Sequence, residues 1–131
     1  MNLFEKKEHF LHSGGISNFK IECDALTDED IETLAYIISQ KFDFFRVNEV
    51  ASKHKPRLGI ALQKYINPDS ENSLIVDDVL TTGASMEDAK FNTWAEYPDG
   101  KEVIGVVIFA RGEPPEWVTP IFWMWDFEEE I

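Results

Sequence analysis

The segment Leu74-Ile-Val-Asp-Asp-Val-Leu-Thr-Thr-Gly-Ala-Ser85 carries the clearest signals of fold and function in this chain. Its first three residues, Leu74–Val76, are an uninterrupted apolar run, which is typical of a strand buried on both faces of a parallel sheet. Two adjacent carboxylates, Asp77 and Asp78, come next, and a short loop then leads into a segment of helical character. Because ligands of open α/β sheets bind beyond the carboxyl ends of the strands, this order predicts a binding site directly after the strand.

The loop after the acid pair has the composition of a phosphate cradle. Its small residues let a phosphate approach the backbone N–H groups, and its hydroxyl groups add donors. The start of the following helix adds the positive end of a dipole. Asp77 and Asp78 lie beside this cradle, where they can accept hydrogen bonds from sugar hydroxyls or hold a hydrated Mg²⁺. The predicted cradle consists of Thr81, Thr82, Gly83, Ala84 and Ser85.

Strand patterns and helix patterns alternate along the rest of the chain. Thr27 and Asp30 have the spacing of a capping box, and the helix after them carries one apolar stripe, made of Ile31, Leu34, Ile38 and Phe42. We expect further helices at Asn2–Leu11, from Pro56 onward and after a capping pair at Ser85 and Asp88. We expect strands at Phe19–Cys23, Phe44–Val47, Leu74–Val76, Val103–Ala110 and Ile121–Trp125. This alternation predicts an α/β fold with a mainly parallel sheet flanked by helices, in a single domain over residues 1–131.

Composition limits the classes of partner. The chain has 131 residues, 44% of them hydrophobic, so one folded domain is expected rather than disorder. Its 25 acidic and 12 basic side chains give a net charge of −13, which argues against nucleic acid or an anionic membrane as partner. The longest apolar run, Val103–Ala110, is too short to span a bilayer. A single cysteine, Cys23, cannot form an internal disulfide, and we expect a cytoplasmic protein.

The segment Leu74–Ser85 resembles the signature loop of the type I phosphoribosyltransferases, which bind 5-phosphoribosyl 1-diphosphate (PRPP). The match is position by position at Asp77, Asp78, Thr81, Thr82, Gly83, Ala84 and Ser85. The resemblance implies a Rossmann-like fold in which the two acids hold the ribose hydroxyls and the loop grips the 5′-phosphate. It also implies Mg²⁺, held by Asp77 and Asp78 through water, and transfer of ribose 5-phosphate from PRPP to a nitrogenous base with release of pyrophosphate. We also expect a homodimer.

Two other interpretations of the acid pair stay open. The first is a phospho-acceptor site of a receiver or phosphatase domain. The phosphatase pattern needs two aspartates separated by one residue, which the adjacent Asp77 and Asp78 do not satisfy. The second is a solvated turn between a strand and a helix, but the strand, acid pair and phosphate loop occur together in the required order.

A second segment, Phe10–Glu22, is similar to the N-terminal part of orotate phosphoribosyltransferases, which lines the base pocket. The matching residues are Ser13, Gly14, Ser17 and Phe19, and the resemblance implies a base pocket at Ser13 and Phe19. His12 stands where that subfamily commonly has lysine, so the identity of the base is left open. The alternative interpretation of this segment is a polar turn that enters a strand.

A basic cluster follows the strand predicted at Phe44–Val47. It consists of Lys53, His54, Lys55 and Arg57, beside a helix start at Pro56. The resemblance places pyrophosphate at this loop, and Ala51, Ser52 and Lys53 are the best candidates for its core. A solvated basic loop is the alternative.

One departure from the family concerns catalysis. Family enzymes usually carry a further strand and a long mobile loop before the PRPP loop, whereas here only the six residues Asn67–Asn72 intervene before the third expected strand. Two functions are therefore carried forward: a phosphoribosyltransferase, and a catalytically weak or inactive regulator that binds PRPP or a nucleotide. A sugar-phosphate hydrolase or binding module is a third interpretation.

Overall fold

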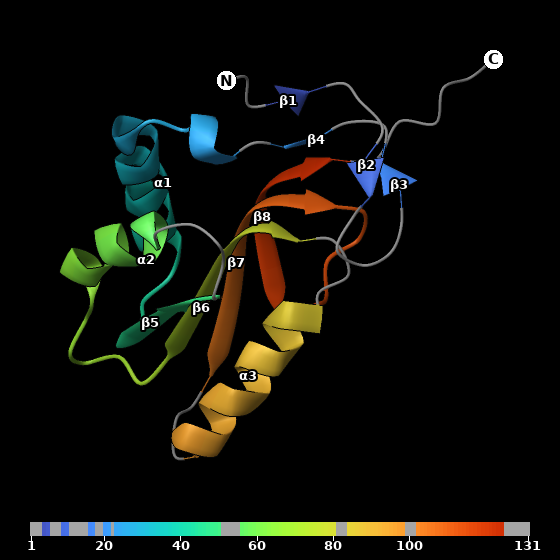
Figure 1. Ribbon diagram of the computed structural model, residues 1–131. Coiled ribbons are helices and arrows are strands. Elements are labelled where there is room, and N and C mark those ends of the chain that lie inside the picture. The colour runs from blue at the N-terminus through green and yellow to red at the C-terminus, as the bar shows by residue number, and fades with distance from the viewer. Residues whose placement is uncertain are drawn as a thin grey trace.

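A four-stranded parallel sheet forms the centre of the molecule (Figure 1). The computed structural model describes residues 4–5, 9–10, 16–17, 20–21, 23–50, 56–80, 84–98 and 102–124. The strand order is β5 (Arg46–Glu49), β6 (Ser73–Leu80), β7 (Val103–Arg111) and β8 (Val118–Met124), with every neighbouring pair parallel. The expected α/β fold with a parallel sheet is thus confirmed.

Helices cover both faces of this sheet (Figure 1). Helix α1 (Asp28–Lys41) begins at the capping box of Thr27 and Asp30 and packs against α2 (Arg57–Leu62), which continues into the 3₁₀ turn η2 (Gln63–Tyr65). These helices share one buried cluster with Leu74 and Val76 of β6. Helix α3 (Ala84–Glu96) contributes to the cluster that contains Ile75, on the opposite face. The uninterrupted apolar run of β6 is therefore explained by burial on both sides.

One of the two helical crossovers between neighbouring parallel strands does not have the usual right-handed sense. The chain moves in the same direction across the sheet from β5 to β6 through α2 and from β6 to β7 through α3. Because α2 and α3 lie on opposite faces, the two crossovers have opposite hands, and one of them is left-handed, which is rare. From β7 the chain returns to the start of β8 without a helix, over residues 112–117.

Several expectations for individual elements need correction. The helix expected at Asn2–Leu11 is wrong: β1 (Phe4–Glu5) pairs with β4 (Lys20–Ile21), and β2 (His9–Phe10) pairs with β3 (Ile16–Ser17), both antiparallel. Apolar spacing within a short segment cannot reveal such pairing with residues further along the chain.

Smaller differences concern element boundaries. Cys23 belongs to a 3₁₀ turn, η1 (Cys23–Ala25), instead of a strand. Strand β5 starts two residues later than expected, and Phe44, which precedes it, is fully buried. Ser85 lies within the first turn of α3 and not at its cap. In the described parts of the chain, no helix is long and apolar enough to cross a membrane.

Gly105 of β7 makes the short return to β8 possible. A Cβ atom built on Gly105 would lie 2.6 Å from the ring of Trp117 and 2.9 Å from a methyl group of Val118. We predict that Gly105→Ala lowers the free energy of unfolding by about 1–3 kcal/mol, because the ring and strand would have to shift. Chemical denaturation measures this change. The double variant Gly105→Ala, Trp117→Leu removes the contacted ring and should lose less than the sum of the two single changes; strict additivity would contradict the proposed contact.

Candidate functional site

The acid pair lies in the carboxyl-terminal half of β6. Strand β6 extends past the predicted Val76 to Leu80, and Asp77 is in register with Val107 of β7. Each aspartate carboxylate accepts a hydrogen bond from the next backbone N–H: Asp78 donates to Asp77 Oδ1 at 2.8 Å, and Val79 donates to Asp78 Oδ1 at 2.7 Å. These bonds hold the two carboxyl groups close to the strand end, where the sequence predicts ligand binding.

Asp77 is held in an environment that favours its neutral form. Burial above all, together with a hydrogen bond to the Asp78 carboxyl and the charges of Asp78 and Glu49, raises the pKa of Asp77 to about 8. The N–H of Asp78 acts in the opposite direction but does not outweigh these effects. At neutral pH the Asp77 carboxyl group is therefore protonated, a form that can both donate and accept hydrogen bonds.

Glu49, which the sequence analysis did not select, is a third carboxylate of this site. It ends β5, the strand next to β6, and its Oε1 accepts a hydrogen bond of 3.1 Å from the N–H of Gly59 in α2. Burial raises the pKa of Glu49, and the charge of Asp78 adds to this, while the N–H groups of Gly59 and Leu58 oppose it. Asp77 is predicted as a site residue because it is an acid near the carboxyl end of a strand, and Glu49 has the same position in β5.

The predicted phosphate cradle is described only in part. Ala84 and Ser85 form the first turn of α3, directly after the end of β6, and Thr81, Thr82 and Gly83 lie outside the described residues. Ser85 and Glu49 line one cavity of about 370 Å³ between the end of β5 and α3. The structure thus brings the start of α3, β5 and the acid strand β6 to the same end of the sheet.

The predicted pyrophosphate segment, Ala51, Ser52 and Lys53, and the predicted base-pocket residues, Ser13 and Phe19, also lie outside the described residues. Arg57, however, has a structural role. Its guanidinium donates to the carbonyl groups of Leu26 at 2.9 Å and Cys23 at 3.1 Å, so this member of the basic cluster holds the start of α1. The Gly59 N–H at the start of α2, where an anion was expected, is occupied by Glu49.

The segment between α2 and β6 is as short in the structure as the sequence indicates. After η2 the chain reaches Ser73 through residues 66–72, which contain no strand. All residues from η2 to β6 are described, and between these two elements the further strand and the long loop of the family are absent.

The side chains of the site also bear on metal binding. Among the residues that the structure describes, no three His, Cys, Asp or Glu side chains form a group that could hold a metal ion. Two adjacent carboxylates still suit Mg²⁺, because this ion commonly binds one or two carboxylates and takes its other ligands from water and substrate phosphates. The described residues therefore fit an Mg²⁺ ion that takes part of its ligands from a phosphorylated molecule.

Comparison with known proteins identifies the fold. No protein-family model and no curated protein matches the chain. An orotate phosphoribosyltransferase from Aeropyrum pernix superposes with a TM-score of 0.67 at 16% sequence identity, covering 93% of this chain and 88% of that chain. An orotate phosphoribosyltransferase from Francisella tularensis superposes with a TM-score of 0.54 at 17% identity, covering 87% of this chain and 69% of that chain. The chain therefore has the phosphoribosyltransferase fold that its sequence predicts.

The raised pKa of Asp77 predicts how stability depends on pH. The carboxyl group loses its proton near pH 3.8 in the unfolded chain but only near pH 8 in the folded one, so stability falls as the pH rises between these values. Asp77→Asn stays neutral and keeps an acceptor for the Asp78 N–H. We expect this variant to be more stable than the parent by up to about 6 kcal/mol above pH 8, with little difference near pH 4. Urea denaturation across this range, with the exposed Asp43→Asn as control, tests it; a difference independent of pH would contradict it.

The charge of Glu49 predicts a second effect. Glu49→Gln keeps an oxygen that can accept the hydrogen bond from Gly59 but removes a negative charge that raises the pKa of Asp77. We expect the titration midpoint of Asp77 to fall by about half to one pH unit. Carbon-detected NMR of the aspartate carboxyl groups measures this midpoint. Glu29→Gln, on the exposed side of α1, is the matched control and should leave it unchanged; an unchanged midpoint in Glu49→Gln would show that the two carboxyl groups are not coupled.

Proposed function

We propose that this protein binds PRPP and transfers its ribose 5-phosphate to a nitrogenous base, with release of pyrophosphate. The observation that carries the proposal is the placement of Asp77 and Asp78 at the carboxyl end of β6, just before the start of α3, in a phosphoribosyltransferase fold. The two similar structures are orotate phosphoribosyltransferases, which supports a pyrimidine as the first acceptor to test.

Asp77 and Asp78 have the central role in this proposal. Their carboxyl groups accept hydrogen bonds from the ribose 2′- and 3′-hydroxyls and so orient the sugar. Displacement at the anomeric carbon develops positive charge on the ribose ring, which nearby carboxylates stabilise. The proton held by Asp77 adds a donor, so that the pair can both give and receive hydrogen bonds with two adjacent hydroxyls.

The phosphate groups are bound on either side of the acid pair. Thr81, Thr82, Gly83, Ala84 and Ser85 bind the 5′-phosphate through backbone N–H groups, hydroxyls and the dipole of α3. Ala51, Ser52 and Lys53 receive the pyrophosphate. Mg²⁺, when bound, offsets the charge of the diphosphate and supports its departure. In a chain of net charge −13, affinity for such an anion has to come from local groups of this kind.

The acceptor base is placed by the N-terminal segment in this proposal. Ser13 offers a hydroxyl to the polar edge of the base and Phe19 offers a ring on which the base can stack. Both residues belong to the segment that is similar in sequence to orotate phosphoribosyltransferases.

A second candidate function, a PRPP-binding regulator with weak or no turnover, is favoured by two observations. The chain passes directly from η2 to β6, and the Glu49 carboxylate lies at the start of α2, close to where the leaving diphosphate is expected. A negative group in that place weakens binding of the diphosphate. Incubation with PRPP, Mg²⁺ and a panel of pyrimidine and purine bases separates the two functions: pyrophosphate release supports transfer, whereas tight PRPP binding without release supports the regulator.

The phosphate cradle can be tested by a single change. Thr82→Glu places a carboxylate where the 5′-phosphate is proposed to bind, and we expect PRPP affinity to fall at least about 100-fold, because like charges at this distance repel strongly. Isothermal titration calorimetry with PRPP and Mg²⁺ measures the affinity. Thr33→Glu, on the exposed side of α1, adds the same charge away from the site and should change the affinity little. Equal affinity of Thr82→Glu and the parent would refute the site assignment.

A further inference from the structure

Strand β5 is an edge of the sheet with free backbone groups. In the described part of the chain it pairs only with β6. The Val50 N–H donates to the Val76 carbonyl, and because backbone groups alternate in direction along a strand, the N–H and C=O groups of Val47 and Glu49 point away from β6. The opposite edge, β8, contains Pro120, which has no N–H to donate. Of the two edges, β5 is therefore the one whose strand lacks proline and can accept a further strand.

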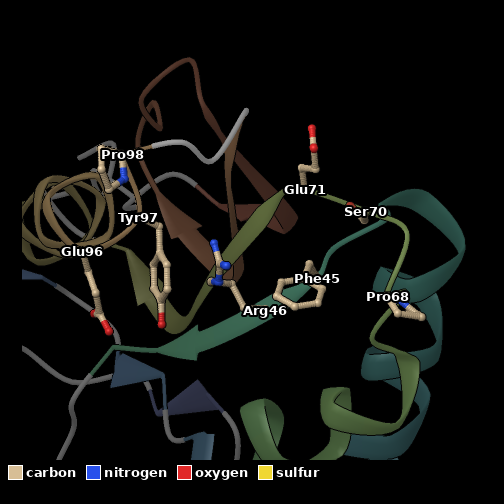
Figure 2. Close-up of a pocket in the computed structure, with 8 residues that line it drawn as sticks. All are labelled: Phe45, Arg46, Pro68, Ser70, Glu71, Glu96, Tyr97 and Pro98. Atoms are coloured by element: carbon tan, nitrogen blue, oxygen red, sulfur yellow. The ribbon is translucent and has the colours of Figure 1, made fainter.

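A groove runs between this edge and helix α3. One cavity of about 390 Å³ lies at the start of β5, beside Phe45 and Arg46 (Figure 2). The cavity of about 370 Å³ described above lies beside the end of the same strand. Glu96 of α3 lines both, so the two cavities follow one another along the strand. A groove between an edge strand and a helix is the geometry in which proteins bind an extended peptide by strand addition.

Arg46 holds the part of the groove at the start of β5 in place. Its guanidinium carbon lies 3.5 Å from the centre of the Tyr97 ring and 5.0 Å from that of Phe45, so it lies between the two rings (Figure 2). One guanidinium nitrogen also donates to the Ser73 hydroxyl at 3.3 Å. These contacts join the end of α3 to β5 and leave the groove open without a peptide, which lowers the ordering cost of binding.

Charge indicates what kind of segment fits. Among the described residues that line the two cavities, the acidic side chains are Glu71, Asp88 and Glu96, in addition to Glu49, which is hydrogen-bonded to Gly59, and the basic side chain is that of Arg46. Asp88 and Glu96 are eight residues apart in α3, on one face of the helix. A second copy of this chain would bring the same acidic groups together, at −13 on each molecule, so a basic partner is favoured over self-association.

We propose that the β5 edge and the α3 groove bind an extended, basic segment of a partner protein as an added strand. Backbone hydrogen bonds to Val47 and Glu49 provide the affinity, and lysine or arginine side chains of the partner reach Asp88 and Glu96. The proposal is argued from other observations than PRPP binding, because the groove opens along the sheet edge and its evidence does not involve Asp77 or Asp78. Ser85 and Glu49, which line the cavity at the end of β5, nevertheless belong to both sites.

The test uses a synthetic peptide of alternating lysine and threonine, about six residues long, with the full-length protein. NMR-detected hydrogen exchange should show that the peptide slows exchange of the Val47 and Glu49 amides, while the Val50 amide, already bonded to Val76, changes little. A peptide of the same sequence with N-methyl groups on alternate residues cannot form the added ladder and should bind at least about 10-fold more weakly. A peptide with glutamate in place of lysine should not bind.

Variants of the groove complete the test. Asp88→Asn and Glu96→Gln should each weaken binding of the lysine peptide about two- to five-fold, and Glu29→Gln on α1 should not. The proposal is overturned if N-methylation leaves the affinity unchanged, if the Val47 and Glu49 amides gain no protection, or if the two groove variants bind as the parent does. Sedimentation of the protein alone gives a further check: a dimer whose formation protects the same two amides would show that the edge binds a second copy instead.

Discussion

Burial of strand β6 on both faces is the constraint on which the rest of the structure depends. Leu74, Ile75 and Val76 have no exposed surface, since α1 and α2 cover one side and α3 the other. A strand in this position must be apolar over its central part, and its polar residues are confined to the end. The acid pair Asp77–Asp78 lies towards that end, before Val79 and Leu80. The same burial that stabilises the sheet thus places two carboxyl groups in a partly desolvated environment, next to the start of α3.

The electrostatics of the site follow from this placement. Three carboxyl groups, from Glu49 on β5 and from Asp77 and Asp78 on β6, lie close enough to affect one another, and burial together with this repulsion raises the pKa of Asp77 and of Glu49. Backbone N–H groups partly offset the cost, because each of the three carboxylates accepts a hydrogen bond from a neighbouring amide. Perturbed carboxyl groups of this kind at the end of a central strand are typical of functional sites.

The short connection before β6 affects two parts of the sheet, namely its carboxyl end and its β5 edge. Since the chain enters β6 directly from η2, no strand from this part of the chain covers β5, and β5 stays at the edge. At the carboxyl end of the sheet, the connection removes the loop that the family resemblance implies for closure over the ligand. Along the side of the sheet, it leaves an open groove against α3, held by the stacking of Arg46 on Tyr97. One short connection therefore fixes both the length of the segment before β6 and the position of β5 at the edge of the sheet.

The sequence by itself determined the local elements whose cause is local. The capping box at Thr27 and Asp30 starts α1 where expected, and the apolar run before Asp77 predicts the central strand. The resemblance of Leu74–Ser85 to the family signature implies the phosphoribosyltransferase fold, which the structure confirms. Only the tertiary structure decided which distant groups meet. Glu49 joins the acid pair through parallel pairing of β5 with β6, Arg57 is turned to the carbonyl groups of Leu26 and Cys23, and the N-terminal segments pair as strands despite their helical spacing. These outcomes depend on strand register and helix packing between residues far apart in the chain, which no short-range pattern encodes.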